Sequence, residues 1–600
     1  MKSCLKSKLA LGLASALAVT AVLSGCGSSD TSGGSAGGDD TSFTYLIDVA
    51  PDSEFYDEYE ENPVYQYWAN LGWDAEGSGE TKTISIDFSA PISGSEKDNL
   101  NTLLATGEYP DIFSTSFCNT SIASLYEEGI ALDLTDYVEK YMPNYLAFVK
   151  ENNLESKVTN KVDGESRYLQ IYQLTEGNGE MWGGFEYRRD WIVKYGTNPE
   201  TGEAFTGGYD ADGVWSDDVV FPSGETDPIY ISDWEWMLDI MDKALDAEGI
   251  TDGYALSIPY AGVHLTGELV CGFGEGGFGW YLDSDGTVQF NAISDGMRAY
   301  LECMAAWYQN GWIDKAFDER TNDAFYEIDA ASMYSGKVGV FWGLLSQLGS
   351  SMDTGSGDES DPLNGIYIAG APQPINDVYG DADHQYILPT DCYAASNIIG
   401  QSIVITSKAE DKDIATLLTA IDYMYTTEGA RLFTFGFSDE QQAELNNEFY
   451  NEHGLSDGAY YISTDENGTE IVNKNSEALN AEDGLATAAC MNRVIGLQAN
   501  FNIATGYAAD IQHSVDLWTK YACTGNMPSV VSKQMTSDQA SEVSLIQSQA
   551  TTYAETEIPQ FIKGSYDINS DEDWDAYVEG YKEIGVEIYC DYANEILQNQ

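Results

Sequence analysis

The chain has 600 residues, of which 43% are hydrophobic and 12% aromatic, so it can fold into at least two globular lobes with cores of their own. Its 99 acidic and 27 basic residues give a formal net charge of −72. Charge of that sign repels nucleic acids and anionic lipid head groups, and we therefore expect no nucleic-acid partner.

The first 42 residues have the pattern of an export signal followed by a tether. Lys2, Lys6 and Lys8 precede the apolar stretch 9–22, which is shorter than the roughly 20 residues of a permanent membrane span. The residues LSGC at 23–26 resemble the lipobox of bacterial lipoproteins, in which the cysteine, here Cys26, carries a lipid. An ordinary signal with a chance cysteine is the alternative.

We therefore expect a lipoprotein signal peptide over 1–25. The following residues, 26–42, are mostly Gly, Ser, Asp and Thr, a composition that favours a flexible tether. The seven cysteines beyond residue 26 show no CxxC or CxxxxC spacing, so the sequence predicts neither a zinc site nor a dense disulfide framework. One or two disulfides stay open.

Strand-like runs alternate with helix-like segments along the remaining chain. The runs lie at 83–88, 111–113, 337–343 and 402–407. The clearest helices are predicted over 232–249, with Ser232 and Glu235 as a capping box and Gly249 as terminator, and over 294–311. This alternation predicts an α/β fold.

Motifs of the common catalytic sites are missing from the sequence. It has no HExxH, no GxSxG and no GxxxxGK[ST]. The stretch GFGEGG at 272–277 matches GxGxxG, but a strand–turn–strand pattern follows it where a nucleotide site needs a helix, so we expect a loop there. A catalytic carboxylate pair cannot be singled out among 99 acids.

A calcium site is one interpretation of the acidic stretch DADGVWSDD at 210–218. Asp210, Asp212 and Asp218 would supply its oxygen ligands, although the glycine and the closing Glu of an EF-hand are missing. A solvated acidic loop is the other interpretation. No further cofactor is indicated.

Several stretches resemble, in the right order, the extracellular solute-binding lipoproteins of ABC sugar importers, family 1 type, in the branch that serves oligosaccharides. They are LNTLLATGEYPDIF (100–113), LYEEGIALDLTDYVEKYMPNY (125–145), FEYRRDWIVKYG (185–196), YQNGWIDKAF (308–317), YSGKVGVFWG (334–343), 403–436 and 561–596. Many relatives carry a calcium loop after the helix that here ends near Ala247, and this chain has DAEGITDGY instead, which departs from that pattern.

The resemblance implies a two-lobed, periplasmic-binding-protein-like α/β fold (Venus flytrap) with a hinge between the lobes. We expect lobe one over about 43–178 and 385–445, and lobe two over about 179–384 and 446–600. The implied function is capture of a carbohydrate, without catalysis, and its delivery to ABC-transporter permease subunits. We expect a monomer, held by its lipid on the extracellular face of the cell membrane. A surface-anchored glycoside hydrolase or polysaccharide lyase is the alternative.

A sugar site needs flat aromatic rings for the C–H faces of the sugar and polar groups for its hydroxyls. Trp342 stands where relatives place a sugar-stacking tryptophan. Further candidate ligand-binding residues follow presumed strand ends or lie beside glycine-rich loops: Tyr260, His264, Ser114, Ser116, Trp182 and Trp280. For each aromatic residue, a place in the hydrophobic core is the alternative.

Overall fold

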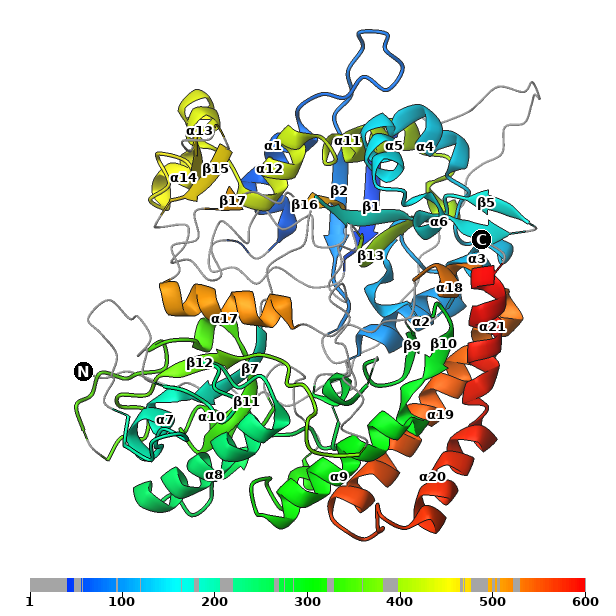
Figure 1. Cartoon of the computed structure of the whole chain (residues 1–600). Helices are drawn as coiled ribbons and strands as arrows, with labels where there is room; N and C mark the ends of the chain where they lie inside the picture. The colour runs from blue at the N-terminus through cyan, green and yellow to red at the C-terminus, as the bar shows by residue number, and fades with distance from the viewer. Residues whose placement is uncertain are drawn as a thin grey trace, which may run out of the picture.

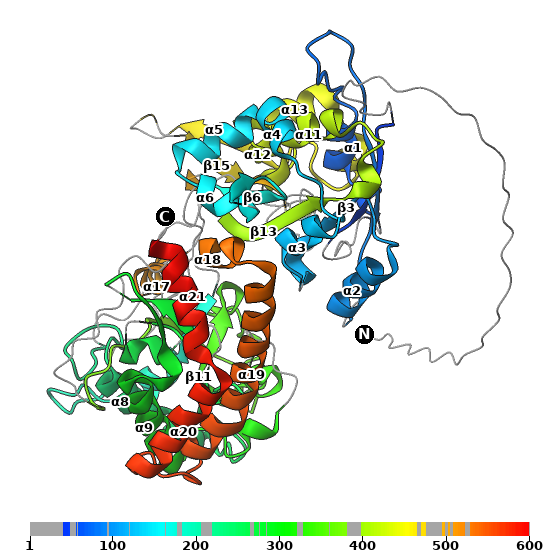
Figure 2. The ribbon, with the colours of Figure 1, turned by 90° about the vertical axis from the view of Figure 1, so that its right-hand side faces the viewer.

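The computed structural model describes most of the chain beyond residue 39. The described residues are 40–47, 56, 58–92, 95–118, 120–162, 164–176, 183–205, 219–263, 269–274, 276–283, 285–320, 328–358, 360–380, 398–464, 468, 470–475, 495–498, 502–503, 508–521 and 529–598. They form two lobes, each with its own sheet (Figures 1 and 2).

Lobe one is built on a six-stranded sheet of order β16-β6-β13-β3-β1-β2. Its strands are β1 (Ser42–Leu46), β2 (Ser85–Ser89), β3 (Ile112–Ser114), β6 (Ile171–Thr175), β13 (Ile398–Ile405) and β16 (Gly496–Gln498). β13 runs antiparallel to both of its neighbours, and the other pairs are parallel. In β1, Phe43 and Tyr45 alternate with exposed residues and point into the core, as a strand with one buried face requires.

Helices complete the core of lobe one. They are α1 (Pro63–Ala69), α4 (Thr135–Tyr141), α5 (Pro143–Glu151), α11 (Ile414–Tyr423) and α12 (Thr427–Phe435). Smaller elements of this lobe are α2 (Glu96–Thr106), α3 (Ile122–Glu127), α6 (Glu155–Val158), β4 (Asn160–Val162) and β5 (Glu165–Arg167). The Asn62 side chain caps α1, and the Trp68 indole donates a hydrogen bond to the carbonyl of Ala420, joining α1 to α11.

Lobe two is built on a four-stranded sheet of order β12-β7-β11-β8. Its strands are β7 (Gly183–Arg188), β8 (Tyr254–Leu256), β11 (Val338–Leu344) and β12 (Ile368–Ala371). β7 is antiparallel to β11 and β12, whereas β8 is parallel to β11. The other elements of this part of the lobe are α7 (Arg189–Tyr195), α8 (Ile231–Glu248), α9 (Asp295–Gln309), α10 (Ala330–Met333) and α17 (Ala509–Lys520).

α8 shows how the sequence sets a helix. The apolar face predicted for it is fully buried, and Gly249 ends it with φ +72°, in the left-handed region where glycine is favoured. The predicted capping box of Ser232 and Glu235 is wrong, because the N-cap of α8 is Tyr230, two residues before Ser232. The carboxylate of Asp233 accepts the backbone N–H of Tyr230, and Ser232 bonds to Asp377 instead.

Residues 439–475 pack against lobe one, although the sequence analysis assigned 446–600 to lobe two. They form α13 (Asp439–Leu445), α14 (Glu448–Glu452), β14 (Tyr460–Thr464) and β15 (Glu470–Lys474), and β17 (Asn502–Ile503) pairs with β15. Tyr450 contacts Phe437, and Tyr460 contacts Phe435, within the core of lobe one. Buried aromatic contacts therefore move this boundary toward the C-terminus.

The C-terminal helices run along one side of lobe two (Figures 1 and 2). They are α18 (Ser529–Gln534), α19 (Ser537–Ile562), α20 (Asp571–Ile584) and α21 (Val586–Gln598). α19 packs on α9, α21 packs on the strand β10 (Val288–Phe290), and α18 also contacts α6 and β4 of lobe one. The antiparallel strands β9 (Trp280–Leu282) and β10 (Val288–Phe290) follow the stretch 272–277, so the strand–turn–strand pattern predicted after GFGEGG is confirmed. The first two residues of the stretch itself belong to the 3-10 helix Val270–Phe273, where a loop was expected.

Candidate ligand-binding site

The carboxyl ends of all strands but β13 in lobe one, and of all strands but β7 in lobe two, face the opposite lobe. β6 leaves lobe one at Thr175, and β7 begins lobe two at Gly183, so the parallel strands of lobe one all end toward lobe two. β8, β11 and β12 run opposite to β7, and their carboxyl ends therefore face lobe one. Ligands of open α/β sheets bind at the carboxyl ends of strands, so this is the candidate site.

Ser114 and Ser116 lie on the lobe-one side of this region, as predicted from the end of β3. Their hydroxyls are 2.9 Å apart, and Ser116 is exposed. Below them, the hydroxyls of Thr115 and Ser402 are 2.7 Å apart, and Ser402 donates to the Gln170 side chain at 2.9 Å. This buried network fixes the turn, and it leaves the Ser116 hydroxyl facing solvent.

Trp342 lies near the carboxyl end of β11 but is only 4% exposed. Its neighbour across the strand pair is Phe185, and the tip of its ring lies beside Gly183, where a Cβ would be 2.7 Å from the ring atom Cη2. A glycine is therefore needed at 183 for the indole to reach this position. The ring is part of the core of lobe two, and its tip points to the place where the chain enters from lobe one.

Tyr260 follows β8 on the lobe-two side, and the C-terminal helix α19 holds it. Its hydroxyl donates to the Glu555 carboxylate at 2.6 Å. Nearby, Gly262 has φ +74° and lies against Ile562, with its carbonyl accepting the Tyr300 hydroxyl at 2.7 Å. The loop that carries Tyr260 is thus fixed by α9 and α19.

Trp280 is held in the same way by α21. Its indole donates to the carbonyl of Val586 at 2.9 Å, and its ring contacts Phe290 and Tyr589 with centroids 4.5 and 5.0 Å away. These contacts use most of the ring for packing. The sequence analysis missed Glu555 and Val586, because they lie about 300 residues further along the chain and no local motif marks them.

The other predicted residues lie outside the described part of the chain: Trp182, His264, Asp210, Asp212 and Asp218. Among the described residues, no three His, Cys, Asp or Glu side chains gather as metal ligands do. Of the cysteines in the described part of the chain, Cys118, Cys303 and Cys590 are free thiols. None of the helices in this part of the chain combines the length and the apolar character that crossing a membrane requires.

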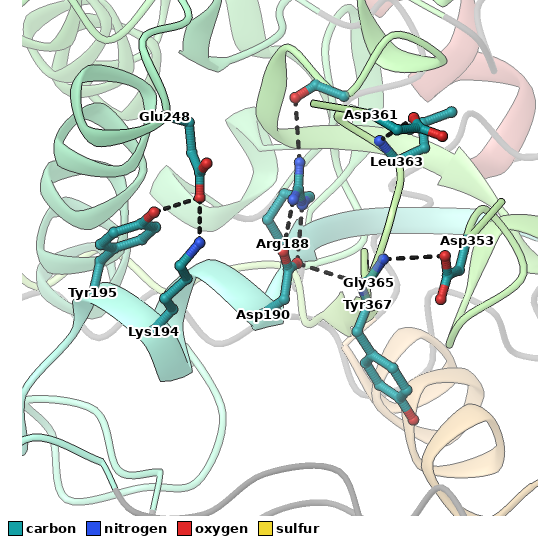
Figure 3. Close-up of polar contacts among 11 residues, drawn as sticks. Arg188, Asp190, Lys194, Tyr195, Glu248, Asp353, Asp361, Leu363, Gly365 and Tyr367 are labelled. Carbon is teal, nitrogen blue, oxygen red and sulfur yellow. Dashed lines mark hydrogen bonds and ion pairs between the residues drawn. The ribbon is translucent and has the colours of Figure 1, made fainter. Parts of the chain in front are cut away.

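The stretch FEYRRDW carries the carboxyl end of β7 and the start of α7, where a network of polar contacts forms (Figure 3). The Arg188 guanidinium donates to both carboxylate oxygens of Asp190, at 2.9 and 2.6 Å, and to the carbonyl of Gly336 at 3.2 Å. Asp190 also accepts the backbone N–H of Tyr367 at 3.3 Å. Burial raises the pKa of Asp190, and Arg188 opposes that rise. This network joins the ends of three strands and positions the sheet.

α8 and α9 cover one face of the lobe-two sheet, and α17 covers the opposite face. α17 lies between this sheet and lobe one (Figure 1). It packs closely because the strands offer glycines: Trp518 lies on Gly184 and Ser514 on Gly370. On its outer side, Nε2 of His513 lies 3.0 Å from both carboxylate oxygens of Asp227, and this hydrogen bond raises the pKa of His513.

A hollow of about 380 Å³ lies between β5 and the start of α4 in lobe one. It is lined by Asp133, Thr135, Asp136, Tyr137, Glu165, Ser166 and Arg167. Arg167 forms ion pairs with Asp133 and Glu165, so its charge is already balanced. Since these residues lie near the amino end of β6, the hollow is separate from the candidate site.

No protein-family model matches the chain, and no curated protein sequence does. Solved structures match over 93% of it. FusA of S. pneumoniae, an ABC-transporter substrate-binding protein in complex with kestose, has 17% identity, a TM-score of 0.60 and 100% of its own chain covered. The fold is that of an ABC-transporter solute-binding protein. The predicted two-lobed α/β fold class is therefore confirmed.

Two other solved structures share this solute-binding-protein fold over 93% of the chain. An HMO-binding solute-binding protein associated with an ABC transporter, from Bifidobacterium longum infantis, has 13% identity, a TM-score of 0.60 and 99% of its chain covered. The alginate-binding protein AlgQ2, solved without calcium ion, has 15% identity, a TM-score of 0.57 and 98% of its chain covered. At these identities the likeness identifies the fold.

Proposed function

We propose that this protein is an extracellular solute-binding protein that captures an oligosaccharide and delivers it to ABC-transporter permease subunits, without catalysis. The observation that carries the proposal is the extent of the fold match. It covers 93% of this chain and 98–100% of proteins whose names give kestose, HMO or alginate as what they bind. The match therefore extends over both lobes of this protein and over almost the whole length of each of these binding proteins.

The candidate site supports this proposal. A sugar offers apolar C–H faces and a ring of hydroxyls, and the facing strand ends offer the ring tip of Trp342 and the exposed residue Ser116, whose hydroxyl is shared with Ser114. Ser114, Tyr260 and Trp280 complete the proposed rim, together with Trp182 and His264. Because the rim is divided between two lobes, a ligand that contacts both would favour their closure.

The proposed lipid anchor at Cys26 would be joined to the folded body through β1. β1 begins at the edge of lobe one that faces away from lobe two. There Lys412 donates to the carbonyl of Ser42 at 2.8 Å and to the Asp111 carboxylate at 2.7 Å. A tether over 26–42 would therefore join the body at its far end and leave the strand ends accessible to ligand and permease. We propose a monomer in this position on the outer face of the membrane.

Titration calorimetry of the purified protein with kestose, alginate oligosaccharides and a wider set of oligosaccharides tests the proposal. One of them should bind, without new reducing ends. Ser116→Ala should weaken that affinity about 2- to 12-fold, the value of one net hydrogen bond of about 0.5–1.5 kcal/mol. Ser335→Ala, at an exposed turn on the far edge of lobe two, is the matched control and should bind as wild type. Binding of none of the sugars, or cleavage of one, would overturn the proposal.

A further inference from the structure

The centre of the lobe-two sheet contains a carboxyl group that its fold does not pair. Glu186 is 0% exposed, and neither of its carboxyl oxygens has a hydrogen-bond partner among the residues that the structure describes. Its neighbours on β7, Phe185 and Tyr187, contact Trp234 and Phe221 on the α8 side of the sheet. Since successive strand residues point to opposite faces, Glu186 points to the face that α17 covers.

On one side, the carboxyl group of Glu186 contacts the turn that follows Trp342. A Cβ on Gly343 would lie 2.6 Å from Oε2 of Glu186 and 2.5 Å from Oε1 of Gln347, so both side chains occupy the space that the glycine leaves. Gln347 is itself fully engaged. Its Oε1 accepts the backbone N–H of Leu344, and its Nε2 donates to the Tyr334 hydroxyl, both at 2.7 Å. The turn supports the carboxyl by contact alone.

On the other side, α17 covers the carboxyl group of Glu186. The Trp518 indole donates to the carbonyl of Phe185 at 2.9 Å, and the backbone N–H of Gly370 donates to Oγ of Ser514 at 3.0 Å. Phe185 precedes Glu186 in the strand, and Gly370 is its partner on β12. Two turns of the helix are therefore fixed directly beside the acid, and they close it off from solvent.

No cation is offered to this acid by the described elements around it. Arg188, on the same strand, is paired with Asp190, and β11 and β12 contribute no ionisable side chain. α17 contributes Asp510, His513, Asp516 and Lys520. Its two potential cations have other partners, because His513 bonds to Asp227 and Lys520 to Tyr521. Burial raises the pKa of Glu186 well above its ordinary value.

We propose that Glu186 is a positioning residue that seats α17 and the 343–347 turn only while its carboxyl is neutral. Ionisation requires the helix to lift, because only water can then solvate the charge. The turn continues directly from Trp342, so lifting α17 also loosens the strand end that carries the proposed sugar-stacking ring. In that part, the inference rests on the proposed function.

The linkage has a defined slope. With α17 lifted, the exposed carboxyl titrates near its free value of about 4.3, whereas with α17 seated it stays neutral to a much higher pH. Between these two values the lifted form gains about tenfold in population for each pH unit, because it alone releases the proton. The seated form is thus fully favoured at acid pH and is progressively lost as the pH rises.

Hydrogen exchange of the ligand-free protein from pH 6 to 9 tests this, with exchange times scaled for the intrinsic rate. Protection of 509–520 and 343–347 should fall about tenfold per pH unit more steeply in wild type than in Glu186→Gln, whose amide cannot ionise. Glu186→Met also removes the ionisable group and adds no buried amide. It should show the same shallow pH dependence of protection as Glu186→Gln, and it replaces that variant if the amide impairs folding. Glu248→Gln is the control, because Glu248 lies on the outer side of α8, bonded to Lys194 (Figure 3), and it should keep the wild-type slope. Equal slopes in wild type and both Glu186 variants would overturn the inference.

A second measurement uses kestose as the probe, by calorimetry at pH 6.5 and 8.5. Where kestose binds, its affinity should fall with pH more in wild type than in Glu186→Gln, and an equal fall would contradict the link to the binding site. Absence of kestose binding would exclude kestose as the ligand, and the same comparison is then made with the oligosaccharide that the calorimetric screen finds to bind. The exchange measurement contains no sugar, so it decides the role of Glu186 independently.

Discussion

Replacing Trp342 with alanine separates its packing role from its proposed binding role. The indole is 4% exposed within the core of lobe two, so its removal leaves a cavity. Substitutions of this kind cost about 3–5 kcal/mol of stability, more than the roughly 1–3 kcal/mol that one aromatic contact supplies to a binding site. We therefore expect Trp342→Ala to lower the free energy of unfolding by about 3–5 kcal/mol, with Trp342→Phe losing less than half of that.

Urea unfolding gives the free energy, and calorimetry on the folded fraction gives the affinity for whichever oligosaccharide binds wild type. Trp307→Phe is the control, because Trp307 is 0% exposed in the same lobe and stacks on Trp234 away from the strand ends. It should lose stability and keep affinity, whereas Trp342→Phe should lose both. If Trp342→Ala unfolds within 1 kcal/mol of wild type, the ring is not packed as the structure has it. If Trp342→Phe binds as wild type, the stacking role is refuted.

Three further results are expected. Cys26→Ser should leave the protein soluble or retained with its signal, and fractionation that finds it processed and still tightly membrane-bound would contradict the anchor. The stability difference between wild type and His513→Gln should be full below about pH 6.5 and shrink as the pH rises through the raised pKa of His513, because only the protonated ring forms an ion pair with Asp227. It should not exceed about 1 kcal/mol for this partly exposed pair, and urea unfolding at pH 6 and 9 measures it. Small-angle scattering should show a smaller radius of gyration when a bound oligosaccharide closes the lobes, and an unchanged profile with a tight ligand would refute the hinge.

Local pattern was enough to find the elements that position the site. The apolar runs at 111–113 and 337–343 form β3 and β11, and the helix predicted over 294–311 forms α9 between Ser294 as its cap and Gly311. Each of these depends on residues within one element, where alternation or helical spacing decides the outcome. The start of α8 was predicted wrongly, because the Asp233 carboxylate caps the helix by accepting the backbone N–H of Tyr230, and Ser232 has no capping role.

Contacts between distant parts of the chain could not be predicted in this way. Tyr260 and Glu555 are 295 positions apart, and Trp280 and Val586 are 306 apart. Nothing in IPYAGVH or in the glycine-rich loop indicates that a C-terminal helix will pack there. The same reason explains the misplaced boundary at 446, where aromatic packing with Phe437 determined the lobe.

Glu186 is the sharpest case of a residue whose environment local sequence cannot give. In GGFEYR, alternation places Phe185 and Tyr187 on a buried face and Glu186 on the opposite one, which a two-layer protein would leave in water. α17, more than 300 residues later, covers that face and turns a solvent-facing acid into a buried one. The flanking glycines were the available signal, since a strand with Gly183 and Gly184 invites close packing by another element.

Glu186 and Trp342 lie on adjacent strands and point to opposite faces of one sheet. Trp342 packs on the side of α8 and α9, while Phe341 joins Trp518 of α17 on the other side. Gly184 lies opposite Gly343 where these two strands pair, so no side chains of this pair separate α17 from the backbone. A shift of α17 would therefore act on the indole through the backbone of the strands alone. α17 comes directly after β16 and β17 of lobe one in the sequence. The packing of α17 on the sheet would therefore couple movement of the lobes to the shape of the proposed binding site.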